Sequence, residues 1–334
     1  MEGHKYVPSF THYINLENDM FDISKFKWNW TTLSCLKTKF PYPKFGCIYE
    51  QFSKCRLINR GHRSNVYKMI NHPYIIKICK TKQPPIYTTT GKIMIQDGEY
   101  VKSLLIKHVQ HIIQPVYSCV LVGTEDVYEL NIYDKWDGDL FNLCIQLMKQ
   151  NITNFEHDSS KRYSICTISL LHETSLFLLN LLKCLKESNV VHTDIKLENI
   201  LFKWDRTTSK INLILTDLEG ICNYKTTTSW KSGQGTSAYC RPIRDCAYPI
   251  YADDAYASYR TILYIVELSK QLSIHQTRDL LHKSYKYSYM FINILCDYIL
   301  PMLENAENTI SCMQMSINIL QKTTLYSTLK NNIN

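Results

Sequence analysis

A chain of 334 residues with 45% hydrophobic and 20% charged residues has the composition of an ordinary globular protein, which excludes a disordered or fibrous chain. Its net charge of +8 favours anionic partners such as nucleotides and acidic proteins. The basic residues are dispersed, without a long Lys/Arg block, so nucleic acid is not expected as a direct ligand.

The cysteines and the apolar stretches indicate the compartment. The 13 cysteines include no C-x-x-C pair, and the N-terminus has no apolar signal-peptide core. The longest apolar stretches, 176–185 and 289–303, are interrupted by polar residues and are shorter than the ~20 residues that a membrane span requires. We expect an intracellular protein of the cytoplasm or nucleus, with reduced thiols and no membrane contact.

The first part of the chain predicts an extension followed by strands. Residues 1–54 are rich in Trp, Tyr and Phe, so we expect an N-terminal extension that packs on the following domain. From 55 to 132 the pattern predicts short strands around one helix, at 97–108. The predicted strands are 55–57, 66–69, 74–79 and 116–122.

After residue 139 the pattern becomes helical. Apolar residues recur every three or four positions from 164 to 186, which predicts a long amphipathic helix. A strand-rich part followed by a helix-rich part predicts an α+β protein with two lobes, 55–132 and 133–334.

The segment 192–201, HTDIKLENIL, directly follows the predicted long helix. It resembles the catalytic loop of eukaryotic-type protein kinases, H-R-D-x-K-x-x-N. In that family the aspartate accepts the proton of the substrate hydroxyl and the asparagine binds a metal ion. The lysine between them neutralises charge on the transferred phosphoryl group. The resemblance implies that Asp194 and Lys196 are catalytic and that Asn199 is a metal ligand. A lone His-x-Asp-x-Lys would be an ordinary exposed loop, but the full match lies between an apolar helix and an apolar strand.

Three further segments follow in the order of the same family. The apolar strand 211–215 leads into Asp217 and the letters LEG, which resemble the D-F-G motif and imply that Asp217 is the second metal ligand. Without that context, an aspartate at a strand end is often only a turn residue. Residues 235–242, GTSAYCRP, resemble the end of the activation segment, G-T-x-x-Y-x-x-P. Asp254 begins a segment that resembles the central helix of the C-terminal lobe, where the aspartate fixes the catalytic-loop backbone; it would also serve as a helix cap.

The nucleotide side of the family is matched upstream. Residues 59–66, NRGHRSNV, fit the frame G-x-G-x-x-G-x-V of the phosphate-binding loop, although Gly61 alone keeps its glycine. Asparagine tolerates positive φ better than most residues, which suits the replacement at Asn59. The resemblance implies that Asn59, Gly61, Ser64 and Val66 bind the nucleotide.

Two charged residues are expected to complete the phosphate site. The segment 74–77, YIIK, resembles the V-A-I-K strand, so Lys77 is expected to bind the α- and β-phosphates of ATP; Lys80 is the alternative. Glu99 is expected to form the ion pair that orients this lysine, with Asp97 as the alternative.

The segment 133–141 resembles the hinge between the two lobes. In the family the hinge backbone meets adenine, and the resemblance implies that Asp139 contacts the ribose.

The sequence departs from the family at four positions. Thr193 replaces the arginine that pairs with a phosphate on the activation segment, which predicts that such phosphorylation does not control this chain. Ile243 replaces the glutamate of A-P-E, which removes one ion pair. Ile75 replaces a small alanine over adenine, and Glu219 replaces the glycine of D-F-G.

The resemblance covers residues 55–265 and implies a bilobal protein kinase fold, with a small β-rich N-terminal lobe and a larger helical C-terminal lobe. The expected function is that of a serine/threonine kinase that uses ATP with Mg²⁺ (or Mn²⁺) and acts on protein substrates. Lys196, two residues after the expected base, is typical of serine/threonine kinases. A pseudokinase that binds nucleotide or protein as a scaffold is the alternative, favoured by the lost glycines. A small-molecule kinase would usually lack the Thr236/Tyr239 pattern. The Ile/Asn/Lys/Tyr-rich composition also resembles that of kinases from large DNA viruses.

Overall fold

The computed structural model describes 16 stretches of the chain, and all statements below refer to them. They are residues 31–32, 55–60, 64–70, 72–80, 86–87, 93–94, 99–106, 109–122, 127–153, 160–205, 207, 210–224, 235–241, 250–270, 295–305 and 310–322. The predicted extension 1–54 therefore lies outside the described residues, except for strand β1 (Thr31–Thr32). Gly61, Asp97 and Ile243 also lie outside them.

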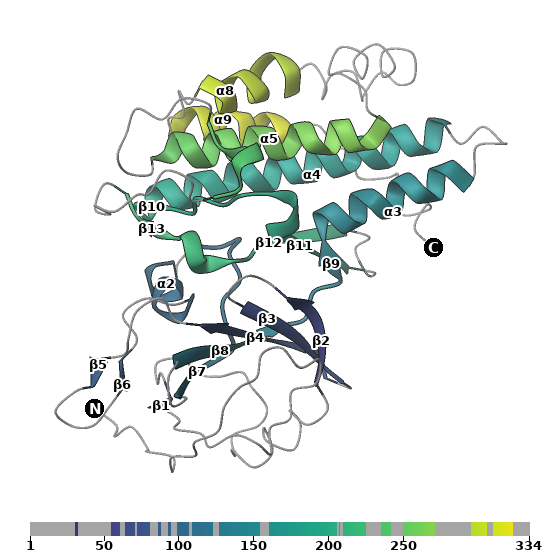
Figure 1. The fold of residues 1–334 in the computed structure, drawn as a ribbon. Coiled ribbons are helices and arrows are strands. Elements are labelled where there is room, and N and C mark those ends of the chain that lie inside the picture. The colour runs from purple at the N-terminus through teal and green to yellow at the C-terminus, as the bar shows by residue number, and fades with distance from the viewer. Residues whose placement is uncertain are drawn as a thin grey trace. The chain divides into compact units, whose positions relative to one another are not determined.

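The chain divides into two compact units. The first contains Met1–Lys107 and Ile113–Lys135, and the second contains His108–Ile112 and Trp136–Asn334. The first unit is built on a β-sheet and the second mainly on helices (Figure 1). The predicted α+β class, with a strand-rich part followed by a helix-rich part, is confirmed.

The first unit contains a six-stranded antiparallel sheet. In sheet order its strands are β1 (Thr31–Thr32), β7 (Tyr117–Val122), β8 (Val127–Asp134), β4 (Tyr74–Lys80), β3 (Ser64–Met69) and β2 (Cys55–Arg60). A separate pair joins β5 (Ile86–Tyr87) and β6 (Ile93–Met94). The four predicted strands are thus confirmed. The predicted helix is present as α2 (Glu99–Leu105); residues 97, 98, 107 and 108 of the prediction lie outside the described residues.

The central strands of this sheet are covered on both faces. Ile76 and Ile78 on β4 and Leu130 and Ile132 on β8 are fully buried. On the opposite face β8 contains Glu129, Asn131 and Tyr133, which are also buried and alternate with the apolar residues because strand side chains have a period of two. The sheet therefore has one polar buried face.

The second unit is organised around α4 (Ser160–Glu187). Leu171, Leu178, Leu182 and Leu185 lie three to seven residues apart on it and are buried, so one face of the helix forms the core. α4 packs against α5 (Tyr251–Lys270) and α9 (Ile310–Lys322) (Figure 1). The second unit also contains α3 (Leu140–Thr153), the π-helix η5 (Leu295–Ile299) and α8 (Leu300–Asn305). The predicted helix 164–186 is confirmed.

Short strands position the loops of the second unit. β11 (Ile200–Asp205) pairs antiparallel with β12 (Lys210–Leu215) and with β9 (Gly138–Asp139), while β10 (Val190–Val191) pairs with β13 (Cys222–Asn223). Ile200 lies opposite Leu215, so the loops before β11 and after β12 meet at the same end of this hairpin. The backbone N–H of Thr216 donates to the carbonyl of Asn199 at 2.8 Å. No helix among the described residues has the length and apolar character to cross a membrane.

Candidate active site

The loop 192–199 is fixed by a buried carboxylate on α5. Asp254 is 1% exposed; its two oxygens accept the backbone N–H groups of His192 and Thr193, each at 2.7 Å. Because hydrogen bonds to a carboxylate are short and strong, this pair of bonds fixes the backbone at the start of the loop. Burial raises the pKa of Asp254 to about 7, and the two N–H groups act against that shift. Asp254 lies within the first turn of its helix, but its contacts are with the loop.

Asp194 lies at the centre of a hydrogen-bond network. Its Oδ2 accepts from Lys196 Nζ at 2.7 Å and from Asn199 Nδ2 at 3.0 Å. Its Oδ1 accepts from the backbone N–H and the hydroxyl of Thr236, at 3.0 and 2.9 Å. Lys196 also donates to Thr236 Oγ1 at 2.7 Å. The structure therefore brings Asp194, Lys196 and Asn199 together with the threonine of the 235–241 segment.

Asn199 has its amide orientation fixed by this network. Its Nδ2 donates to the backbone carbonyl of Asp194 at 2.9 Å as well as to the carboxylate. The residue is 7% exposed, and it occupies the last position of the 3₁₀ turn η2 (Leu197–Asn199). With both donor contacts made by the nitrogen, the oxygen Oδ1 is the atom that faces away from Asp194 and can bind a cation.

Asp217 occupies an unusual backbone conformation. It has φ 67° and ψ 75°, in the left-handed region that non-glycine residues rarely adopt. The 3₁₀ turn η3 (Leu218–Gly220) follows it, and the fully buried Leu218 fixes that turn in the core. Such outliers are maintained only where the surrounding structure determines them. Asp217 and Asn199 lie in the two loops that the β11–β12 hairpin brings to one end.

Two glycines pack against the backbone of this loop. A Cβ on Gly220 would lie 2.6 Å from the carbonyl oxygen of His192, and a Cβ on Gly235 would lie 2.7 Å from that of Thr193. Gly235 also has φ 89°. Since backbone atoms cannot move aside as a side chain can, both positions require glycine. Both glycines that flank residues 221–234 therefore pack against Thr193.

The end of that segment is attached to α5. Arg241 forms an ion pair with the buried Asp253, with Nε and Oδ1 3.0 Å apart. Arg260 donates to the carbonyl of Ala238 at 3.2 Å, and the Tyr239 ring lies 5.0 Å from that of Tyr264. The sequence analysis did not predict the Arg241–Asp253 pair. Arg241 occupies a variable position of the 235–242 motif and Asp253 belongs to none, so only their opposite charges were visible.

In the first unit, Lys77 and Glu99 form the ion pair that the sequence predicts. Lys77 Nζ and Glu99 Oε1 are 2.5 Å apart, and the side chains are 14% and 1% exposed. The other oxygen of Glu99 accepts from the hydroxyl of Tyr133 at 2.8 Å, and its backbone N–H donates to Glu129 at 2.7 Å. Lys80, the alternative lysine, is exposed at the end of β4.

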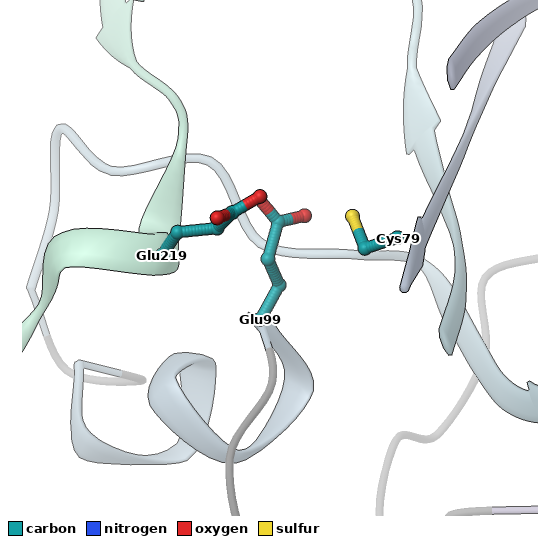
Figure 2. Close-up of side chains that lie close together, drawn as sticks. All are labelled: Cys79, Glu99 and Glu219. Atoms are coloured by element: carbon teal, nitrogen blue, oxygen red, sulfur yellow. The ribbon is translucent and has the colours of Figure 1, made fainter. Parts of the chain in front are cut away.

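The surroundings of Glu99 can be followed in Figure 2. Glu99 begins α2, and Cys79 lies near the end of β4, with its Sγ within 4.8 Å of a Glu99 carboxylate oxygen. Both side chains are buried. Glu219, which the figure also labels, belongs to η3 of the second unit.

The proposed phosphate-loop residues that the structure describes lie on β2 and β3, and β3 is the strand next to the Lys77 strand β4. Asn59 on β2 is opposite Val66 on β3, and Val66 is opposite Lys77 on β4. Directly opposite residues share one face of a sheet, so Val66 lies on the same face as Lys77. Ser64 is the first residue of β3, and Gly61 lies outside the described residues. A register shift between Leu57 and Asn59 bends β2 just before the loop.

Asp139 has a structural contact that the sequence analysis did not assign. Its carboxylate accepts from the backbone N–H of Asn142 at 2.8 Å and from the Asn142 side chain at 2.7 Å. Asp139 directly precedes α3, so it acts as the N-cap of that helix. The signal in the sequence was an aspartate, Asp139, directly before the helical pattern and three residues before Asn142.

His192 is neutral in the folded protein. It is fully buried, and burial lowers its pKa from 6.5 to about 4. Its Nδ1 accepts from the backbone N–H of Asp194 at 3.4 Å. The neutral His192 ring therefore packs beneath the loop and accepts a hydrogen bond, and we assign it no role in proton transfer at neutral pH.

Comparison with known proteins identifies similar folds. No protein-family model and no curated protein matches the sequence. The ROP18 kinase domain in complex with AMP-PNP and sucrose is 13% identical, with a TM-score of 0.46 over 95% of this chain and 85% of that chain. Vaccinia related kinase 3 is 11% identical, with a TM-score of 0.47 over 82% and 90%. ROP2 from Toxoplasma gondii, a virulence factor with a protein-kinase fold and no enzymatic activity, is 12% identical, with a TM-score of 0.43 over 80% and 82%. The likeness is one of fold.

Proposed function

We propose that the chain is a serine/threonine protein kinase that transfers the γ-phosphate of ATP to protein hydroxyl groups. The observation that supports this most strongly is the network around Asp194, in which Lys196, Asn199 and Thr236 all donate to one carboxylate. Asp254, which fixes the loop backbone, accepts from two backbone N–H groups. Asp194 instead accepts hydrogen bonds from three side chains, those of Lys196, Asn199 and Thr236, and it is partly exposed.

The proposed chemistry assigns a role to each of these groups. The substrate hydroxyl oxygen bonds to the γ-phosphorus as the bond to the β,γ-bridging oxygen breaks, and the hydroxyl proton passes to Asp194. Lys196 stabilises the charge on the transferred phosphoryl group. Thr236, bonded to both residues, fixes the distance between the carboxylate and the ammonium.

The residues expected to bind Mg²⁺ fit such an ion. Mg²⁺ requires hard oxygen ligands, and Asn199 offers its amide oxygen because its nitrogen is engaged by Asp194. Asp217 offers a carboxylate from the adjoining loop. When bound, the ion would neutralise charge on the phosphate oxygens. Mn²⁺ would fit the same ligands.

ATP is the proposed cosubstrate. Lys77 would contact the α- and β-phosphates, oriented by Glu99. Val66 would contact the base, with Asn59, Gly61 and Ser64 near the phosphates and Asp139 near the ribose. A protein substrate rather than a small molecule is favoured by the 236–241 segment, whose attachment to α5 through Arg241 gives a firm surface for a peptide.

A scaffold without catalysis is the second candidate, and specific residues favour it. Asn59 and Ser64 replace two loop glycines, and Ile75, half-buried on the face of β4 that contains Lys77, would crowd adenine. Glu219 replaces the D-F-G glycine. Under this hypothesis the hydrogen bonds around Asp194 would stabilise the loop without taking part in catalysis.

Phosphate transfer from [γ-³²P]ATP to a generic basic protein decides between the two. The wild-type protein with Mg²⁺ or Mn²⁺ should label the substrate, and Asp194→Asn should reduce the rate by ~10²–10⁴ while retaining the fold. Asp297→Asn, a change of the same type at an exposed position on η5, is the control and should retain full activity. Equal labelling by the wild type and Asp194→Asn would overturn the proposal.

A further inference from the structure

Tyr133 is joined to the Lys77–Glu99 pair by a contact that no motif indicates. It lies near the end of β8, is 6% exposed, and donates its hydroxyl to Glu99 Oε2 at 2.8 Å. Lys77 bonds the other carboxylate oxygen, Oε1. Each oxygen of Glu99 thus has its own donor, and the two donors come from neighbouring strands.

The strand register explains why both side chains reach the same carboxylate. Tyr133 lies opposite Ile75 on β4, and Ile75 is two residues before Lys77. Opposite residues share a face, as do residues two apart, so Tyr133 and Lys77 are diagonal neighbours on the polar face of the sheet. Glu99, at the start of α2, lies over this face and bridges β4 and β8.

The chemistry of Glu99 requires a second donor. A buried carboxylate is costly unless both of its oxygens are hydrogen-bonded. An ammonium bonded to one oxygen leaves the other oxygen without a donor, and the carboxylate can then rotate about its bond to the side chain. Burial and the facing carboxylate of Glu99 raise the pKa of Tyr133 well above its ordinary value, so its hydroxyl stays protonated and donates throughout the accessible pH range. The carboxylate is therefore fixed in one rotation.

We infer that Tyr133 is a positioning residue: its hydroxyl fixes the Glu99 carboxylate and, through it, the ammonium of Lys77. The consequence for ATP rests on the proposed function, but the effect on Lys77 does not. Loss of the hydroxyl leaves one buried oxygen of Glu99 without its donor, so the carboxylate is no longer fixed in one rotation. The bond between Lys77 and Glu99 is then formed for a smaller share of the time, and the ammonium becomes more available to other reagents.

The test compares Tyr133→Phe with Tyr67→Phe. Tyr67 is equally buried on β3 of the same sheet and hydrogen-bonds Asn65, but it lies on the opposite face and does not contact Glu99. The full-length variants are treated with an amine-reactive ester, and acylation of Lys77 is followed by peptide mass spectrometry. Tyr133→Phe should raise the Lys77 acylation rate several-fold, and Tyr67→Phe should match the wild type. An unchanged rate in Tyr133→Phe, or an equal rise in both variants, overturns the inference.

A second readout measures catalysis. For Tyr133→Phe, kcat/KM for MgATP should fall roughly tenfold or more, since a hydrogen bond to a charged group is lost, while Tyr67→Phe stays at the wild-type value. If the wild type neither binds nor turns over ATP, the proposed function fails, and the acylation rates still decide the role of Tyr133. Wild-type turnover with an unchanged kcat/KM in Tyr133→Phe contradicts the inference alone.

A double-mutant cycle separates positioning from a general effect on stability. With Glu99→Gln already present, adding Tyr133→Phe should change the Lys77 acylation rate little further, because the shared partner is gone. Additive effects would overturn the inference. Should Tyr133→Phe fail to fold while Tyr67→Phe folds, the hydroxyl supports the sheet as a whole and the inference is overturned.

Discussion

Thr193 donates a hydrogen bond from its hydroxyl to the backbone carbonyl of Gly220, at 3.1 Å. Thr193 has φ 76°, which is costly for a β-branched residue, and its N–H is bonded by the buried Asp254. Its own carbonyl faces Gly235 so closely that a Cβ there would clash. Thr193 therefore contacts both ends of the segment 221–234 through neutral groups.

The first prediction concerns phosphorylation of that segment. An arginine at position 193 would bind a phosphate with two charge-assisted hydrogen bonds, which a threonine cannot do. Protein treated with phosphatase, with phosphate loss verified by mass spectrometry, should phosphorylate a peptide at the initial rate of untreated protein. A large drop in rate that preincubation with ATP reverses would show that another cation replaces the missing arginine.

Gly220→Ala should destabilise the protein by about 1–3 kcal/mol, because the new methyl group meets the His192 carbonyl at 2.6 Å and the loop must shift. Gly138→Ala is the matched control. Its Cβ would lie 3.0 Å from the ring of Phe202, a side chain that can move, so the loss should be smaller. Urea denaturation gives both free energies of unfolding, and an equal loss would contradict the assigned role of Gly220.

The buried His192 predicts a pH-dependent stability. Its pKa is about 4 in the folded protein and near 6.5 when unfolded, so between these values the unfolded chain binds a proton that the folded chain does not. The contribution of His192 to stability is therefore lost as pH falls from 6.5 to 4, by roughly 2–4 kcal/mol.

His192→Asn isolates this effect. Asp254, with its pKa raised to about 7, acts in the opposite direction, since the folded state takes up its proton first as pH falls. Asp254 is present in both proteins, so the difference in unfolding free energy between wild type and His192→Asn reports His192. That difference should shrink as pH falls; a constant difference would mean that His192 is protonated while folded.

ATP binding should depend on Mg²⁺. Calorimetric titration of the wild type should show ATP affinity at least several-fold weaker in EDTA than with Mg²⁺, because the phosphate oxygens and Asn199 and Asp217 share the ion. Asn199→Ala should lose most of this dependence, whereas Asn212→Ala, at an exposed position on β12, should keep it. Equal affinity in EDTA and Mg²⁺ for the wild type would favour the scaffold hypothesis.

Local sequence patterns predicted the elements of this fold well. The helix around 164–186 and the strands around 55–57, 66–69, 74–79 and 116–122 follow from the spacing of apolar residues, and the structure has each of them. The loop 192–199 could be predicted because its chemistry requires fixed residue types at fixed spacing. The polar alternation of Glu129, Asn131 and Tyr133 on β8 was a visible signal of a functional face that the analysis did not use.

Long-range contacts could not be predicted in this way. His108–Ile112 belongs to the second unit because Leu215 donates its N–H to the His111 carbonyl at 2.8 Å and Ile112 pairs with the same strand. These partners are about a hundred residues apart in sequence and have no shared motif. The Tyr133–Glu99 and Arg241–Asp253 contacts were missed for the same reason, since no motif defines the spacing of either pair.

Helix α2 has only seven residues, too few to be stable in water without tertiary contacts. The hydrogen bonds of its first residue, Glu99, to Lys77, Tyr133 and Glu129 are among the tertiary contacts that stabilise this helix. Any molecule that draws the Lys77 ammonium away removes one of these contacts, and the first turn of α2 then exchanges its amide hydrogens faster. Binding of a ligand to Lys77 and the order of the first turn of α2 are therefore coupled.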